Sequence, residues 1–419
     1  MAQRLLCVGK SVERSILQFI NMYGGCFMKP RKIKDNIYWM GFVDWDTRLF
    51  DSLIPLPDGT SYNAFLIKGS EKTVLIDTVE SKLFYELEAQ LESVEKLDYV
   101  ISLHAEQDHS GSIPHVLARY PDAKLITSAK AKGILMDHLH VAEESIITVE
   151  DGETLSLGDK VLEFMYTPWV HWPETMVAFL REDNILFSCD FFGSHIATSD
   201  LFITDEARSY EAAKRYYAEV MMPFRKVIKK NLAKIGKYDI EIIAPSHGPL
   251  IQRPSFIIDA HNEWIDDLPK NKVIIPYVSM HSSTRKMVDY FVSALVDRGV
   301  SVQQFDLTVT DIGKLAIALV DAGTIVVGSP TVLAGPHPLA AYAALLANAL
   351  RPKARFLSII GSYGWGGRTV EILSSLVPNL KVEVIEPVLV KGAPRKEGFA
   401  ALENLAETIA VKHKEQGLR

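Results

Sequence analysis

The sequence has few cysteines, no basic excess and no long apolar run, and each absence excludes a class of protein. Its three cysteines, Cys7, Cys26 and Cys189, form no disulfide framework, and so sparse a count is typical of the reducing cytoplasm. The net charge of −7 gives no support to a nucleic-acid-binding role. No apolar run approaches the roughly 18 residues of a transmembrane helix, so we expect no membrane span.

A length of 419 residues predicts two domains, or three at most. Residues 1–31 stand apart as an N-terminal extension. Gln18 and Asn21 interrupt its apolar stretch, which argues against a signal peptide. We interpret it as an added helix or the product of an upstream start codon, with Met28 as a plausible true start.

Residues 32–268 show short strands with turns, mixed with helices. β-Branched and aromatic residues predict strands at 37–43, 62–68, 73–77, 98–103, 161–166, 175–180, 185–188 and 240–244. Apolar periodicity predicts helices at 81–93 and 209–233. This unit is therefore expected to mix strands and helices in two sheet-rich halves.

Residues 269–419 change to a regular alternation after a linker near 266–271. Strands are predicted at 272–278, 300–306, 324–328, 354–361 and 381–385. Helices are predicted at 284–297, 312–321 and 339–350, with others near 370 and 400. Alternation of this kind predicts a doubly wound parallel sheet with a cofactor crevice at its strand ends.

Four short runs of the first unit form a candidate site for two metal ions. They supply four imidazoles, three carboxylates and no thiolate, from His104, Glu106, Asp108, His109, His171, Asp190 and His247. Such a set indicates iron or manganese ahead of structural zinc. A lone histidine is more often structural than a ligand, but chance placement of all four runs is improbable. Asp190 ends a predicted strand and can bridge two ions with its two oxygens.

The remaining histidines lack such a context. We interpret His195 as a candidate supporting residue near the metals. We expect ordinary roles for His115, His138, His140 and His261, although His138 and His140 form a pair in a predicted helix-to-strand connection. Cys189, next to Asp190, is expected to be a small buried apolar residue.

Three loops of the second unit are candidates for flavin contact. Alone, each reads as an ordinary turn or helix N-cap, but together they follow successive parallel strands. Hydroxyls and N–H groups at a helix start can bind phosphate, and glycines let the backbone approach a planar ring. The candidate residues are Ser279, Met280, His281, Ser282, Ser283, Thr284, Pro330, Thr331, Val332, Leu333, Ser362, Tyr363, Gly364, Trp365 and Gly366.

These motifs, in this order, resemble the flavodiiron protein family over residues 32–412. The resemblance rests on the runs at 104–111, 171–176, 187–190, 245–248 and 362–367. It implies a metallo-β-lactamase-like αββα domain followed by a flavodoxin-like domain. It also implies one iron on His104, Glu106 and His171, a second on Asp108, His109 and His247, and Asp190 as the bridge. Hydrolytic relatives usually have histidine at the position of Glu106, and their metal is usually zinc.

The chain departs from the family pattern at two places. Glu174 stands where family members often have aspartate, at a position that is not an expected ligand. Ser282 and Ser283 replace a common Gly-Asn pair in the phosphate loop, and His281 replaces an aromatic residue, which puts flavin affinity in question.

The resemblance implies reduction of dioxygen to water, or of nitric oxide to nitrous oxide, with electrons passed through FMN to two irons. It implies a head-to-tail homodimer, or a dimer of such dimers. No Cys-x-x-Cys pair or appended reductase domain is present, so we expect an external donor, rubredoxin or reduced F420. The ligands serve both substrates alike and leave the preference open.

Two other functional classes remain as alternatives. The first is a zinc hydrolase with an appended electron-transfer domain, against which Glu106 argues. The second is a flavodoxin-type electron carrier whose metal half is structural, against which the complete ligand set argues. The metal content distinguishes the first, because iron is expected of the reductase and zinc of the hydrolase.

Overall fold

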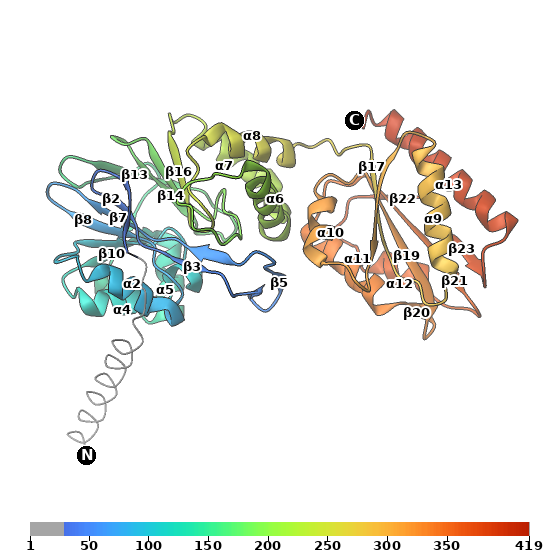
Figure 1. The fold of residues 1–419 in the computed structure, drawn as a ribbon, viewed down its shortest axis with the longest axis horizontal. Helices are drawn as coiled ribbons and strands as arrows, with labels where there is room; N and C mark the ends of the chain where they lie inside the picture. The colour runs from blue at the N-terminus through green and yellow to red at the C-terminus, as the bar shows by residue number, and fades with distance from the viewer. Residues whose placement is uncertain (1–28, 419) are drawn as a thin grey trace, which may run out of the picture.

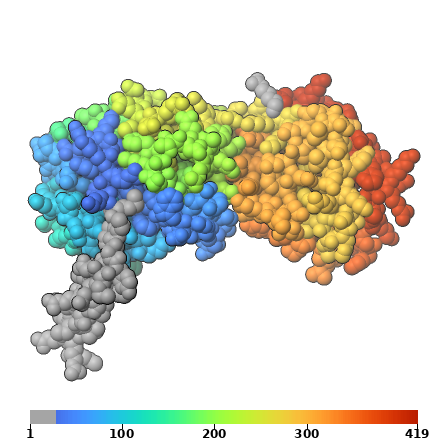
Figure 2. All heavy atoms as spheres, in the orientation of Figure 1, coloured from blue at the N-terminus to red at the C-terminus, as the bar shows by residue number. Residues whose placement is uncertain are grey.

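The structure is a computed structural model that describes residues 29–418. Figure 1 shows two units joined by a single connection between helix α8 (Pro254–Ile265) and strand β17 (Lys272–Tyr277), and Figure 2 shows them as adjacent lobes. A search of the described residues finds no helix long and apolar enough to cross a membrane.

The first unit is built on two sheets. The larger has the order β1-β2-β7-β8-β9-β10-β11. Its strands are β1 (Arg31–Lys34), β2 (Ile37–Trp39), β7 (Phe65–Lys68), β8 (Thr73–Ile76), β9 (Tyr99–Ile101), β10 (Lys124–Ser128) and β11 (Ile146–Val149). The second sheet consists of β12 (Thr154–Ser156), β13 (Val161–Tyr166), β14 (Met176–Leu180), β15 (Ile185–Cys189) and β16 (Ile242–Pro245).

Apolar side chains of both sheets share one buried cluster, which places the sheets face to face. The outer face of the larger sheet packs on α2 (Phe84–Leu91), α4 (Ile113–Arg119) and α5 (Ala129–Leu139). The outer face of the second packs on α6 (Glu206–Tyr216), α7 (Arg225–Ile235) and α8. This helix–sheet–sheet–helix layering is the expected αββα arrangement.

Two short hairpins lie beside these sheets. Strand β3 (Phe42–Asp44) pairs with β6 (Thr60–Tyr62), and β4 (Leu49–Phe50) pairs with β5 (Ile54–Pro55). The single strand predicted at 37–43 is therefore wrong, because β2 and β3 belong to different sheets. The predicted helix at 81–93 is shorter, with a 3₁₀ turn at Ser81–Leu83 before α2.

The continuous helix predicted at 209–233 is also wrong. Helix α6 ends at Tyr216, a π-helical turn follows at Tyr217–Met221, and a 3₁₀ turn containing Pro223 precedes α7. Proline lacks the N–H of a continuing helix, and apolar periodicity does not register a change in helix type.

The second unit is a parallel sheet with the order β18-β17-β19-β21-β22, covered on both faces. Its strands are β17, β18 (Ser301–Asp306), β19 (Thr324–Val332), β21 (Phe356–Tyr363) and β22 (Glu383–Val384), with β20 (Gly335–Pro336) and β23 (Val388–Lys391) at its margin. Helices α9 (Ser283–Val296) and α13 (Lys396–Glu415) cover one face. Helices α10 (Ile312–Leu319), α11 (Pro338–Leu350) and α12 (Thr369–Ser375) cover the other.

This sheet matches the expected doubly wound flavodoxin-like fold, with differences at strand ends. Strand β19 continues to Val332, beyond the predicted end at 328, while β22 is shorter than the predicted 381–385. One apolar cluster joins α6–α8 of the first unit to α10 and α11 of the second, so the two units share buried contacts.

Candidate metal and flavin sites

The seven candidate ligands come from the ends of strands in both sheets of the first unit. His104 and Glu106 follow β9, and Asp108 and His109 lie in the short helix α3 (Gln107–Ser110). The other three lie in the second half: His171 between β13 and β14, Asp190 directly after β15, and His247 after β16. The facing sheets therefore bring four separate runs to one edge.

The ligands form two adjoining groups. His104, Glu106, His171 and Asp190 make one group and Asp108, His109 and His247 another, each with ligand atoms within 4.8 Å of one another. Glu106 Oε2 lies 3.1 Å from His104 Nε2 and 3.0 Å from His171 Nε2. Asp108 Oδ2 lies 3.2 Å from His109 Nε2 and 3.1 Å from His247 Nε2.

Asp190 lies between the groups and faces both. Its Oδ2 is 3.4 Å from His104 Nε2 and 3.3 Å from His171 Nε2. Its Oδ1 is 3.0 Å from His109 Nε2 and 3.5 Å from His247 Nε2. A strand irregularity between Phe187 and Cys189 sets this direction, since register shifts re-aim side chains beside active sites.

The donor atoms fit bound cations. Both carboxylate oxygens of Asp108 and Asp190 and both ring nitrogens of His109 are buried without a hydrogen-bond partner among the described residues. Buried polar atoms are normally satisfied, and metal ligation is a standard reason for an exception. Cys189 lies with His109 and Asp190 in a third group of possible ligands, but burial raises the pKa of its thiol, and the other two groups contain only imidazoles and carboxylates.

The charges of the site depend on one another. Burial alone would lower the pKa values of His109 and His171, but neighbouring carboxylates, chiefly Asp108 and Asp190 for His109 and Asp190 and Glu106 for His171, raise both to about 9. Burial would raise the pKa of Asp190, yet the surrounding histidines hold it well below its usual value. Without cations the site is thus expected to hold protons that metal binding must displace.

Removing the metal should make stability strongly dependent on pH. The raised pKa values of His109 and His171 contribute stability that is present below the unfolded value of 6.5 and lost as pH rises through about 9. In loaded protein the metal replaces these protons. We therefore expect the melting temperature of chelator-treated protein to fall increasingly below that of loaded protein between about pH 6.5 and 9. A constant difference in melting temperature across this pH range would contradict the assignment of these protons to His109 and His171.

Glu174 has a larger role at the metal site than the sequence indicated. Its Oε1 accepts hydrogen bonds from His104 Nδ1 at 2.7 Å and from the Ala105 backbone N–H at 3.2 Å. A carboxylate on the second ring nitrogen fixes the tautomer and orientation of a metal-binding histidine. Its place in the run His171-Trp172-Pro173-Glu174 was the available signal.

Replacing Glu174 by glutamine should weaken iron binding about tenfold, because the amide keeps the acceptor oxygen but loses the charge that holds His104. The measurement is the rate of iron loss to a chelator. Glu144→Gln is the matched control, since the Glu144 side chain is exposed and forms no hydrogen bond or ion pair among the described residues. Equal rates in both variants would rule out this role.

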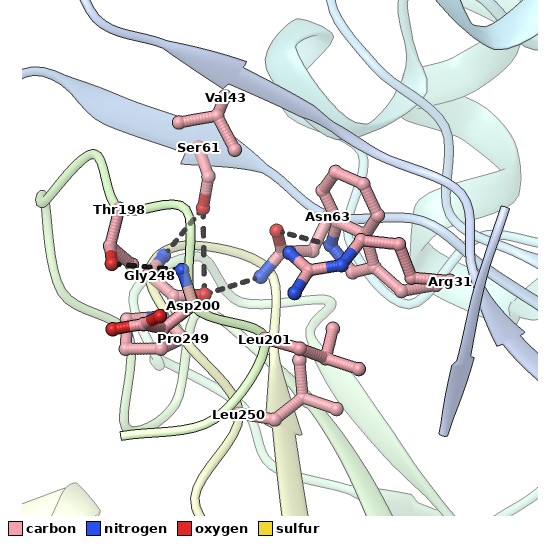
Figure 3. A pocket seen from close by; sticks show the side chains of 11 residues that line it. Arg31, Val43, Ser61, Asn63, Thr198, Asp200, Leu201, Gly248, Pro249 and Leu250 are labelled. Atoms are coloured by element: carbon pink, nitrogen blue, oxygen red, sulfur yellow. Dashed lines mark hydrogen bonds between the residues drawn. The ribbon is translucent and has the colours of Figure 1, made fainter. Parts of the chain in front are cut away.

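His247 and the turn that carries it are hydrogen-bonded to Ser61 and Asn63, two residues that no sequence pattern singled out. Its Nδ1 lies 2.7 Å from the Ser61 carbonyl oxygen. Asn63 donates to the carbonyls of Pro245 and Gly248 at 2.7 and 2.8 Å, and Ser61 Oγ accepts from the Gly248 N–H at 2.8 Å. Figure 3 shows Ser61 and Asn63 directed at this turn. Gly248 has φ of 81°, a conformation that favours glycine.

His195 packs against the second group and belongs to none of the groups that could hold a metal among the described residues. Its ring centroid lies 4.9 Å from that of His247, and its Nδ1 is 2.9 Å from Thr60 Oγ1. Burial and the neighbouring His247 hold its pKa well below the usual value, so the ring is neutral. Phe50, on hairpin β4–β5, packs 5.0 Å from the same ring.

Four histidines were expected to have ordinary roles: His115, His138, His140 and His261. Among the described residues, none of them lies in a group that could hold a metal. The prediction for His138 is corrected in one respect. It lies within α5 rather than in a connection, and His140 ends that helix with φ of 54°.

The flavin candidates gather at the carboxyl edge of the second sheet. Thr284 Oγ1 lies 3.4 Å from Ser362 Oγ, which brings the first and third loops together. Pro330 pairs with Ser362 across β19 and β21, which places the second loop beside the third. Pro330, Thr331 and Val332 belong to the end of β19 rather than to a free loop, a correction to the prediction.

The donor chemistry of this edge fits a flavin phosphate and ring. Ser282 precedes α9 with φ of 64°, and its side chain makes no capping bond there. Ser279 Oγ accepts from the Arg285 N–H at 3.2 Å, which leaves the N–H groups of Ser283 and Thr284 available to an anion. Trp365 is 77% exposed and Gly364 and Gly366 have open space where a Cβ would lie, so a planar ring can approach.

Comparisons with known proteins agree with this arrangement. A family model described as ODP family beta lactamase matches residues 60–248. The chain is 36% identical to a nitric oxide reductase of Moorella thermoacetica, covering 92% of this chain and 99% of that one. It is 32% identical to a coenzyme F420H2 oxidase of Methanothermobacter marburgensis, covering 84% and 91%.

A solved structure extends the agreement to both units. Rubredoxin oxygen:oxidoreductase of Desulfovibrio gigas superposes with a TM-score of 0.89 at 30% identity, covering 93% of this chain and 99% of that one. The chain belongs to the flavodiiron protein family. The three proteins are named as a nitric oxide reductase, a coenzyme F420H2 oxidase and an oxygen oxidoreductase, and none of the three is named as a hydrolase.

Proposed function

We propose that this flavodiiron protein reduces dioxygen to water and nitric oxide to nitrous oxide at a site for two iron ions. His104, Glu106 and His171 would hold one iron, and Asp108, His109 and His247 the other. The observation that carries this proposal is Asp190, whose two buried oxygens each face a different group of ligands. Four electrons and four protons convert one dioxygen molecule to two waters. Two electrons and two protons convert two nitric oxide molecules to one nitrous oxide and one water.

When bound, iron and FMN supply the electron-transfer chemistry, and iron adds Lewis acidity. The protein side chains supply charge and position. Asp108, Glu106 and Asp190 provide three carboxylates that offset the charge of two cations and favour their oxidised form. Glu174 orients the His104 ring, and the Ser61 carbonyl orients the His247 ring. Burial of six of the seven ligands, with His171 half-buried, limits water around the site.

FMN is the flavin that we assign to the loops at the carboxyl edge of the second sheet. The N–H groups at the start of α9, with Ser279, Ser283 and Thr284, would receive its phosphate. The backbone at Gly364 and Gly366, with Tyr363 and Trp365, would contact its ring. The remaining candidates, Met280, His281, Ser282, Pro330, Thr331, Val332, Leu333 and Ser362, surround the same edge.

Replacing Ser283 by glutamate should remove FMN while leaving iron in place. A carboxylate in the first turn stabilises helix α9 but repels a phosphate at the same N-terminus. We expect flavin content to fall at least about tenfold, while Ser283→Gln, of similar size without charge, retains flavin. Flavin absorbance and iron analysis of both purified variants are the measurements. Full flavin content in Ser283→Glu would place the phosphate elsewhere.

A head-to-tail homodimer, alone or paired with a second such dimer, is the assembly that we propose. Hairpin β4–β5 carries Phe50, whose ring centroid lies 6.1 Å from that of His247. The same hairpin has two exposed leucines, Leu49 at 52% and Leu53 at 65%. The flavin loops expose Leu333 by 96% and Trp365 by 77%. Exposed apolar patches at two functional edges favour an interface that joins the flavin edge of one copy to the metal edge of its partner.

An external protein or cofactor would deliver the electrons in the cytoplasm. Rubredoxin and reduced F420 are the two candidates, and the names of the relatives from Desulfovibrio gigas and Methanothermobacter marburgensis include one each. The deciding experiment is the iron and flavin content of protein purified without oxygen, followed by oxygen and nitric oxide consumption after reduction. About two irons and one FMN per chain with turnover support the proposal. Zinc in protein expressed with ample iron would overturn it.

A further inference from the structure

A large groove lies at the boundary of the two units, and it contains none of the proposed metal ligands or flavin-loop residues. Its volume is about 1280 Å³, and its walls are α7 with the turn before it on one side and the segments that precede β21 and β22 on the other. Those segments lie at the amino edge of the parallel sheet, opposite the flavin loops. The groove is therefore remote from the flavin loops, and it approaches the metal site only through Trp169.

The groove is strongly basic although the whole chain carries a net charge of −7. Eight of its lining residues are lysine or arginine, and Asp267 is the one acidic residue among them. A cleft lined by one sign of charge concentrates the field and attracts ions of the opposite sign. An anionic ligand is the occupant that this charge favours.

Half of these cations already have partners within the chain. Arg225 and Lys229 contact the Asp267 carboxylate at 2.9 and 3.3 Å. Arg355 donates to the Asp267 carbonyl at 3.0 Å, and Lys353 donates to the carbonyl oxygens at the end of α8. The acidic residue of the groove is therefore already bound and does not compete for the remaining cations.

The other four cations are exposed and form no ion pair or side-chain hydrogen bond within residues 29–418. They are Lys226, Lys230, Arg351 and Lys381. Lys226 and Lys230 are four residues apart on α7 and project from the same face. Arg351 and Lys381 come from the opposite wall. A chain of several phosphates carries enough negative charge to pair with cations on both walls.

An aromatic platform lies in the same groove. The Trp169 ring is 44% exposed and stacks on Phe224, with centroids 5.7 Å apart and planes at 20°. Exposed indole rings stack on the planar rings of nucleotide bases. Lysine-rich walls are unlike the core of a protein interface, which is depleted in lysine, so a small ligand is favoured over an acidic protein.

We propose that this groove binds a nucleoside polyphosphate, with its phosphates between the two basic walls and its base against Trp169. The ligand would contact both units and so restrain their relative movement. It would also touch the loop that carries His171, two residues beyond Trp169 in the chain.

The test is calorimetric titration of the iron- and FMN-loaded protein with ATP, inorganic triphosphate and adenosine. We expect ATP to bind at one site per chain, triphosphate to bind more weakly and adenosine not to bind. ATP affinity should fall with added salt, because screening weakens contacts to exposed charges. No heat with ATP at millimolar concentration would overturn the proposal, and is the result expected if the groove receives an acidic protein.

Variants of each wall locate the site. Lys226→Gln/Lys230→Gln and Arg351→Gln/Lys381→Gln should each weaken ATP binding about tenfold or more. Lys130→Gln/Lys237→Gln removes the same charge from exposed positions outside the groove and should have no effect. Equal affinity in wall and control variants would place ATP elsewhere.

Trp169→Leu tests the contact with the base. It should weaken ATP binding and leave triphosphate binding unchanged, with iron content showing that the His171 loop remains intact. Equal affinities of ATP and triphosphate in the unmodified protein, with ATP unaffected by Trp169→Leu, would overturn the assignment of a nucleotide.

Discussion

Replacing Asp190 by asparagine should abolish the reduction of both oxygen and nitric oxide. We expect activity to fall by more than about 100-fold, because losing a residue that only supports a metal ligand already costs up to about 100-fold. Asparagine has the same shape but offers only one oxygen. One of the two groups, each within 3.5 Å of an Asp190 oxygen, would therefore lose its shared ligand. An amide also fails to offset the charge of two cations in a buried site.

Iron analysis separates this effect from general damage. We expect bound iron to fall below about two per chain, while flavin content, set by a different unit, stays unchanged. Asp137→Asn is the matched control, because Asp137 is exposed on α5 and its side chain forms no hydrogen bond or ion pair among the described residues. Asp190→Asn protein with full iron and full turnover would exclude a bridging role for this carboxylate.

The candidate metal residues could be selected from the sequence because each lies in a short run near a strand end, and the structure brings all seven close together. Parallel and antiparallel strands whose ends meet at one edge leave little freedom in where His104, Asp190 and His247 can go. The alternating second unit was equally readable, since its buried strands and amphipathic helices have distinct periods.

The contacts that support the metal ligands could not be predicted from the sequence, because they join residues that are distant in the chain. Asn63 binds the turn at Gly248, 185 residues away, and nothing in the sequence around Asn63 indicates this partner. Hairpin β4–β5, which brings Phe50 to His195, is too short to give a periodic signal. Such contacts depend on how the sheets pack, which local patterns do not encode.

The interruption between α6 and α7 shows a second limit of local patterns. Apolar residues continue through the π-helical turn, so the periodicity predicted one helix despite Pro223. Tyr216, the last residue of α6 before this turn, lies near His247 and His195, with its ring centroid 5.9 and 4.8 Å from theirs. Meanwhile Arg215 reaches Asp311 in the second unit. A regular helix would present these neighbours differently, which is why π-turns are common at functional sites.

Electron transfer between chains should be visible in a mixed dimer. One chain would carry Ser283→Glu, which removes FMN, and the other Asp190→Asn, which disables the metal site. In a head-to-tail dimer the intact FMN of the second chain serves the intact irons of the first. A heterodimer isolated through two different affinity tags should therefore recover about half the activity of the unmodified dimer, because one of its two FMN–iron pairs works.

The reciprocal heterodimer provides the control. It pairs an unmodified chain with a chain that carries both Ser283→Glu and Asp190→Asn, so the same numbers of intact FMN and iron sites are present. Transfer between chains leaves no complete FMN–iron pair, and we expect almost no activity. Transfer within a chain reverses both results, with about half activity here and none in the first heterodimer. Because the two heterodimers differ only in which chain holds each defect, that reversed pattern would exclude the head-to-tail route even if both proteins dimerise.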